Sequence, residues 1–311
     1  MIEVEAIRKS YGGTRGLEGF TCRIMDGEIF GLVGPNGAGK TTFIKILSTL
    51  VRPDAGQARV AGYDVTKAAP DVKRVVGYLP DQPGVYQDMR VREFLEFFAD
   101  AFRVRGQQQR VAVEKALLRS GLEKRSESFV EELSFGMKQR LFLAKALLHD
   151  PKVLLLDEPA TGLDPLARID LRTQLKELND QGMTILISSH ILNDLEDICS
   201  RVALIAQGRN AADAAGQNIL EVRRPTALAQ LFEVEFLGDS GAAAKRAEEI
   251  SGTKILESNA SRLLVEIAGG PSEASAFLRQ LVVAGVEVVK FDHPTATLET
   301  RYREVFGAKP A

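Results

Sequence analysis

A glycine-rich segment, residues 34–41 with the sequence GPNGAGKT, combines residue types and a spacing that can do chemistry. Its glycines allow backbone N–H groups to turn inward around phosphate oxygens, where a side chain would block the approach. An apolar helix is expected to begin near Gly39, and its positive end would face the same oxygens. The pattern predicts a loop that cradles phosphate groups.

Each position of this loop has an expected role. Lys40 would reach the β- and γ-phosphates of a bound nucleotide, and the Thr41 hydroxyl can bind Mg²⁺. A ligand-free glycine-rich turn is the alternative, but the apolar strand expected before the loop and the helix after it favour a phosphate site. The other expected nucleotide-binding residues of the segment are Gly34, Pro35, Asn36, Gly37, Ala38, Gly39 and Thr42.

Two acids end the apolar segment 153–156, whose composition is that of a strand buried on both faces. Ligands of an open α/β sheet bind beyond the carboxyl ends of such strands. Asp157 is expected to hold Mg²⁺ there, through water. Glu158 projects differently and is expected to polarise an attacking water as general base. Two solvated acids at a strand end are the alternative, which the phosphate loop disfavours.

Strands that alternate with helices are needed to position these groups. The expected fold is α/β, a P-loop NTPase core with a mostly parallel sheet, a β-rich N-terminal subdomain and a helical insertion at about 84–135. In the insertion, apolar residues recur at three- and four-residue spacing. The strands are expected near residues 2–6, 20–24, 28–33, 58–63, 152–156, 184–188 and 202–206.

A new pattern begins near residue 230. The order of expected elements is β-α-β-β-α-β, which is typical of a ferredoxin-like α+β domain, and a closing helix is expected at 298–306. Residues 211–229 are weakly patterned and read as a linker. The domain limits predicted from sequence are therefore 1–210, 211–229 and 230–311.

Composition narrows the class of protein. The formal net charge of -2 gives no basis for a polyanion-binding surface, so no nucleic-acid partner is expected. No apolar run approaches the roughly 20 residues that span a bilayer, and the N-terminus alternates like a strand. Action at a membrane would therefore need a partner chain. Cys22 and Cys199 lack metal-type spacing and are expected to be buried thiols of a reducing compartment.

Residues 133–140, with the sequence LSFGMKQR, resemble the signature motif of ATP-binding cassette proteins, usually Leu-Ser-Gly-Gly-Gln, and lie just before the acidic strand, as in that family. The segment could open a helix and offer donors to an anion. The resemblance implies that Ser134 and Gly136 clamp the γ-phosphate of ATP held by a second copy. It covers roughly residues 1–210.

Other residues follow the order of this family. Tyr11 resembles the aromatic residue that stacks on adenine, although an ordinary core or turn tyrosine fits nearly as well. Asp164 ends a segment that resembles the loop crossing to the partner subunit, and His190 resembles the histidine that touches the γ-phosphate. Where the family commonly has a metal-binding glutamine, this chain has Asp81 followed by Gln82, and either could contact the metal.

The resemblance implies an ATPase that uses ATP and Mg²⁺ and powers a separate membrane permease from the cytoplasmic face. It pairs with a second nucleotide-binding subunit, as a homodimer or a near-identical heterodimer. The C-terminal region resembles that of exporter-type members, which move drugs, antibiotics or lipids. A non-transport ATPase of DNA repair or translation is the alternative, but the chain has one cassette and no zinc-type cysteines. A P-loop kinase or GTPase would not explain the signature segment or His190.

Overall fold

The computed structural model describes the chain except for residues 85–87, 191–194, 212–218, 222–228 and 293–311. The chain divides into two compact units, whose described residues run to Glu221 in the first and from Ala229 to Asp292 in the second. Within these described ranges, no helix is both long enough and apolar enough to cross a bilayer.

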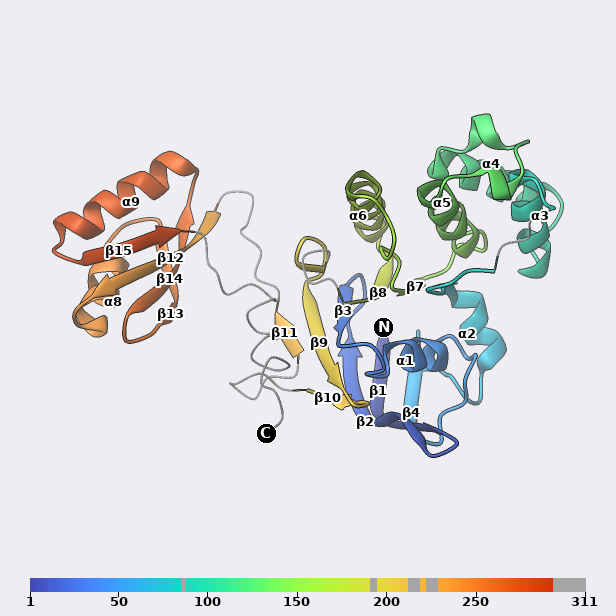
Figure 1. Ribbon diagram of the computed structural model, residues 1–311, viewed down its shortest axis with the longest axis horizontal. Coiled ribbons are helices and arrows are strands. Elements are labelled where there is room, and N and C mark those ends of the chain that lie inside the picture. The colour runs from blue at the N-terminus through green and yellow to red at the C-terminus, as the bar shows by residue number, and fades with distance from the viewer. Residues whose placement is uncertain (85–87, 191–194, 212–218, 222–228, 293–311) are drawn as a thin grey trace. The chain divides into compact units, whose positions relative to one another are not determined.

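The first unit is built on a mostly parallel sheet with the strand order β10-β9-β3-β8-β7-β6 (Figure 1). Strands β6, β7, β8, β3 and β9 are parallel, whereas β10 and β11 pair antiparallel with β9. Every residue of β3, β7 and β8 is buried, which explains their nearly continuous apolar sequences. The strands are β3 (Ile29–Val33), β6 (Val76–Leu79), β7 (Val153–Asp157), β8 (Thr184–Ser189), β9 (Arg201–Ala206), β10 (Arg209–Asn210) and β11 (Ile219–Glu221).

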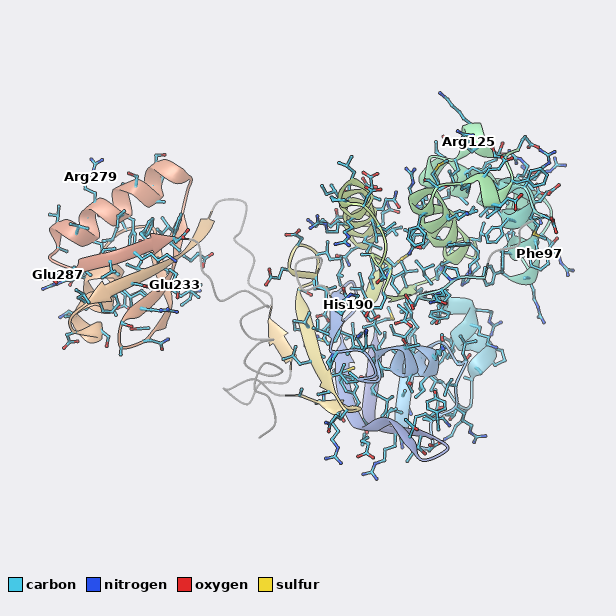
Figure 2. All side chains as sticks on the ribbon, viewed as in Figure 1. Phe97, Arg125, His190, Glu233, Arg279 and Glu287 are labelled. Carbon is cyan, nitrogen blue, oxygen red and sulfur yellow. The ribbon has the colours of Figure 1, made fainter. Side chains whose placement is uncertain are left out.

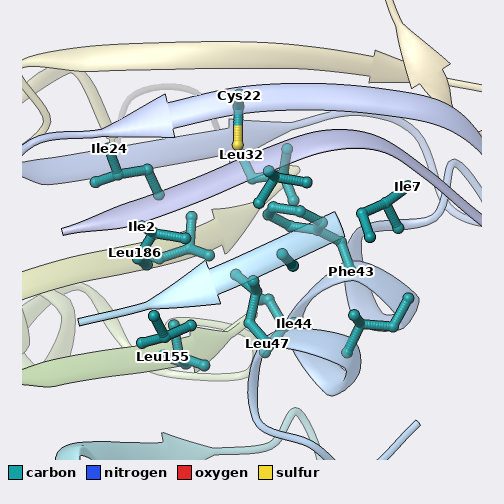
Figure 3. Close-up of a cluster of buried hydrophobic side chains, with 14 of the residues drawn as sticks. Ile2, Ile7, Cys22, Ile24, Leu32, Phe43, Ile44, Leu47, Leu155 and Leu186 are labelled. Atoms are coloured by element: carbon teal, nitrogen blue, oxygen red, sulfur yellow. The ribbon is translucent and has the colours of Figure 1, made fainter. Parts of the chain in front are cut away.

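A second, antiparallel sheet has the order β2-β1-β4-β5 and forms the β-rich N-terminal part. Helix α1 (Lys40–Leu47) contacts this sheet through β2 and β4 and contacts the parallel sheet through β7. The core therefore lies around α1 (Figure 3), where the Phe20 and Phe43 rings meet edge to face at 4.9 Å. The strands are β1 (Ile2–Tyr11), β2 (Thr14–Ile24), β4 (Ala55–Val60) and β5 (Tyr63–Asp64), and helix α2 (Ala69–Val75) follows.

The expected helical insertion lies between β6 and β7. Helices α3 (Val91–Ala101), α4 (Gln107–Ser120) and α5 (Phe135–Ala146) pack against one another. The Phe94 and Phe142 rings, 5.9 Å apart, join α3 to α5. Two short 3₁₀ helices, η1 (Glu123–Arg125) and η2 (Val130–Glu132), connect α4 to α5, and α6 (Pro165–Asp180) follows β7. The α/β fold with its helical insertion is confirmed.

The second unit has its own core beneath a four-stranded antiparallel sheet of order β13-β14-β12-β15. Phe232, Val234 and Phe236 alternate inward from the first strand. The topology is the split β-α-β arrangement expected from sequence. Its elements are β12 (Ala229–Leu237), α8 (Ser240–Glu248), β13 (Thr253–Ser258), β14 (Arg262–Ala268), α9 (Pro271–Val283) and β15 (Glu287–Asp292). The closing helix expected at 298–306 lies outside the described residues.

One stretch differs from its expected structure. Residues 219–221, placed in a linker from their sequence, form β11 and pair with residues 201–203 of β9. These residues form a strand because they pair with β9, and their own sequence pattern does not show that pairing. The first unit therefore extends beyond residue 210.

Candidate nucleotide site

The glycine-rich loop connects β3 to α1, and Gly39 caps the helix with a left-handed φ of 110°. A Cβ atom at Gly34 would lie 2.2 Å from the Ile205 carbonyl oxygen, and one at Gly39 would lie 2.4 Å from the Gly16 carbonyl oxygen. Side chains at these two positions would thus collide with neighbouring strands. Gly34 and Gly39 are therefore required by the packing of the loop against these strands. This requirement is additional to the close approach of phosphate oxygens that was expected from sequence.

Lys40 lies across the loop and is only 6% exposed. Its Nζ donates to the carbonyl oxygens of Gly34 at 2.6 Å and Pro35 at 3.3 Å. The same Nζ lies 3.2 Å from Glu158 Oε1. The ammonium group is therefore held at the mouth of the loop, in reach of phosphate oxygens and paired with the second acid of the β7 segment.

Glu158 is the central contact of the site. Its side chain is 12% exposed, and Oε2 accepts hydrogen bonds from His190 Nδ1 at 2.7 Å and from the His190 backbone N–H at 3.3 Å. The first bond requires a proton on Nδ1, since an ionised carboxylate only accepts. His190, labelled in Figure 2, directly follows β8. Glu158 is therefore held by an ammonium on one oxygen and an imidazole on the other.

Asp157 is fully buried at the end of β7. The Ser188 hydroxyl donates to its Oδ1 at 2.8 Å, while Oδ2 has no hydrogen-bond partner. Burial raises the pKa of Asp157; hydrogen bonds from Ser188 and Thr41 oppose this rise, and the charges of Asp81 and Glu158 add to it. A buried oxygen without a donor is costly unless a cation or a water completes it.

These groups fit a magnesium ion bound together with phosphates. Magnesium in such sites takes one or two protein carboxylates and keeps several waters. Asp157 supplies the carboxylate with its unpartnered Oδ2, and Thr41 supplies a hydroxyl close enough to affect the Asp157 pKa. Asp81 and Gln82 are both exposed, and the charge of Asp81 helps to raise the pKa of Asp157.

The signature-like segment forms a separate group of residues. Ser134 caps α5, its Oγ accepting from the Met137 N–H at 3.3 Å, and Asp164 caps α6, accepting from the Ala167 N–H at 2.9 Å. Both caps and Gly136 line one pocket of about 240 Å³. No hydrogen bond or ion pair of the described chain joins these caps to Lys40 or Glu158.

Tyr11 ends β1, and its side chain is 45% exposed. A Cβ atom at Gly16 would lie 3.1 Å from the Tyr11 ring and 3.3 Å from the Thr42 methyl group. The ring therefore lies near the first turn of α1, beside the phosphate loop. This is a position from which an exposed aromatic face can stack on a base.

Ser188 was not given a role by sequence reasoning. Its Oγ accepts from the Glu158 backbone N–H at 3.0 Å in addition to donating to Asp157. The only signal in the sequence was a serine near the end of an apolar segment, and the structure shows that its side chain is fully buried. Its significance depends on the pairing of β8 with β7, which sequence alone does not show.

Comparisons with known proteins agree with this geometry. The family model described as ABC transporter matches residues 17–161. The Nod factor export ATP-binding protein I of Paraburkholderia xenovorans is 41% identical over 214 residues, covering 69% of this chain and 70% of its own. The linearmycin resistance ATP-binding protein of Bacillus subtilis is 35% identical over 212 residues, 68% of each chain. A solved ATP-binding subunit of an ABC transporter aligns with a TM-score of 0.61 at 32% identity, over 67% of this chain and 87% of that one.

Proposed function

The chain belongs to the ATP-binding cassette family of transporter ATPases, and on that premise we propose which of its residues bind and hydrolyse ATP and which partners it serves. It is the ATP-binding and ATP-hydrolysing subunit of an exporter-type transporter. The observation that carries the site assignment is the contact of Lys40 Nζ with Glu158 at 3.2 Å, at the mouth of the phosphate loop and backed by His190.

ATP binding is proposed to use the loop and the aromatic residue beside it. The triphosphate occupies the segment from Gly34 to Thr42, with its charge matched by Lys40 and by the N-terminus of α1. Adenine stacks on the exposed face of Tyr11. Bound Mg²⁺, held by Thr41 and Asp157 with Asp81 nearby, would neutralise charge that develops on the phosphates.

Hydrolysis is proposed to begin when phosphate oxygens compete with Glu158 for the Lys40 ammonium. Glu158 is then free to accept the proton of the attacking water, and its geometry is kept by the bond from His190 Nδ1. His190 would also be close to the γ-phosphate in this arrangement. In this proposal the Lys40–Glu158 contact is lost when ATP binds and the His190–Glu158 bond is kept, so ATP binding is coupled to proton acceptance.

The partners are proposed to be a second cassette and a membrane permease. Ser134, Gly136 and Asp164 are separate from the Lys40 cluster in one chain, and they would complete the ATP site of a second copy. One chain holds both halves of such a composite site, which favours a homodimer. The pair would work at the cytoplasmic face of the membrane on a permease encoded as a separate chain. A role in DNA repair or translation is not favoured by the exporter relatives.

A substitution at Lys40 tests the site. Removing one preorganised charge typically lowers the rate by about 10²-fold or more, so Lys40→Ala should abolish steady-state ATP hydrolysis. Lys45→Ala is the matched control, because Lys45 lies on the same helix and outside the cluster. Phosphate release should persist in the control. Wild-type turnover in Lys40→Ala would show that the phosphate loop is wrongly assigned.

A further inference from the structure

Ser188 connects the two acids that follow β7. It lies on β8 directly opposite Asp157 in the parallel register, and it is fully buried. Its Oγ receives the Glu158 backbone N–H at 3.0 Å and donates its own proton to Asp157 Oδ1 at 2.8 Å. One hydroxyl thus contacts the backbone of one acid and the side chain of the other.

The direction of these two bonds is fixed by chemistry. A backbone N–H can only donate, so Ser188 Oγ must accept from Glu158. The hydroxyl proton is then left for Asp157, whose ionised carboxylate can only accept. Oδ1 is occupied by this bond, and Oδ2 is the oxygen that remains open. Ser188 therefore occupies Oδ1 and leaves Oδ2 as the oxygen that could bind the proposed metal.

The backbone of Glu158 needs such support. Its φ of 49° lies in the left-handed region, which a residue with a side chain adopts at a cost of order 1–3 kcal/mol. The turn that includes this φ brings the side chain to Lys40 and His190. The Ser188 bond to its N–H is a direct restraint on that backbone.

We propose that Ser188 is a positioning residue for ATP hydrolysis, which orients the Asp157 carboxylate and holds Glu158 in its left-handed conformation. This inference rests on the roles proposed above for those two acids. Ser188 touches neither water nor phosphate in this assignment, and it acts only through its neighbours. A hydroxyl at this position therefore serves the geometry of the two acids.

The test separates positioning from simple loss of a buried hydroxyl. Ser188→Ala should lower kcat roughly 10- to 100-fold, as expected when a reacting group is misplaced, and leave the affinity for ATP without Mg²⁺ unchanged. Thr184→Val is the matched control, because Thr184 is also buried on β8 and its hydroxyl accepts from the Gly27 N–H, at the opposite end of the strand. A structural role alone would lower kcat equally in both variants, and this result would overturn the proposal.

A second readout follows the metal rather than turnover. The Mg²⁺ concentration that gives half-maximal tightening of ATP binding should rise in Ser188→Ala and stay unchanged in Thr184→Val. If Ser188→Ala does not fold, the turnover of Ser188→Thr is compared with that of Ser188→Val. The two side chains have similar shapes, and only threonine keeps the hydroxyl. Higher turnover in the threonine variant supports the proposal, and equal turnover overturns it. An active Glu158→Gln variant would instead refute the role of general base proposed for Glu158, whereas loss of hydrolysis only in Ser188→Ala concerns the positioning role of Ser188.

Discussion

Exchanging Glu158 for glutamine separates ATP binding from hydrolysis. The substitution keeps the shape of the side chain and can still accept a hydrogen bond from His190, which now contacts Oε2 at 2.7 Å. It removes the carboxylate that would accept the proton of water. It also removes the charge that lies 3.2 Å from Lys40 Nζ in the free protein.

The two losses act on different steps and have different sizes. Losing a general base lowers the rate of the chemical step by about 10²- to 10⁴-fold. The Lys40–Glu158 contact is an ion pair, and its loss should let the freed Lys40 bind phosphate more tightly. ATP binding should tighten about tenfold for each ~1.4 kcal/mol of ion-pair attraction that is removed. Binding and turnover thus change in opposite directions.

Single-turnover hydrolysis and gel filtration with ATP and Mg²⁺ measure both effects. The Glu158→Gln variant should elute as a dimer, because closure is proposed to follow binding and opening to follow hydrolysis. Glu177→Gln, an exposed acid on α6, is the control and should behave like the wild type. Wild-type hydrolysis in Glu158→Gln would identify another base, with Asp81 as the first to examine. Loss of ATP binding would make Glu158 a structural or metal-binding group.

Three further outcomes are expected. Burial raises the pKa of Asp157, so the free energy of unfolding is lowered as pH rises from the unfolded pKa of this group through its folded pKa. Asp157→Asn removes this ionisation and should raise the Tm of the nucleotide-free protein at pH 7. The difference in Tm between variant and wild type should disappear in acid. A chain ending at Glu221 should bind ATP like the full chain, because the proposed site residues all precede that position; a folded but non-binding truncation would contradict this. Burial raises the pKa of Cys22 to about 12, so alkylation followed by mass spectrometry should show no labelling of Cys22 at pH 8 until denaturant is added.

The local chemistry of the site could be predicted from sequence because it depends on neighbouring residues. The spacing of Gly34, Gly39 and Lys40 defines a loop whose backbone groups act within one turn. The acids at 157–158 were likewise marked by the apolar strand before them. In both places, residue types and their order were enough to predict the kind of chemistry. The roles of these residues remain the proposals made above.

Contacts between distant segments could not be predicted in the same way. The bonds of Ser188 to the two acids cross 30 and 31 residues and depend on the register of β7 with β8. Serine at a strand end is common, so its type carries no signal without that register. Residues 219–221 are a similar case, because β11 is formed by pairing with β9 and lacks a strong pattern of its own.

In the free site, the buried charge of Lys40 is paired with the charge of Glu158. The Lys40 ammonium is 6% exposed and would be costly without partners, but it has two carbonyl oxygens and the Glu158 carboxylate. The same pairing occupies the proposed base while no phosphate is present. Under the proposed mechanism, an incoming triphosphate must take over the lysine before Glu158 can accept a proton. A contact that stabilises the empty site therefore also delays water activation until ATP is bound.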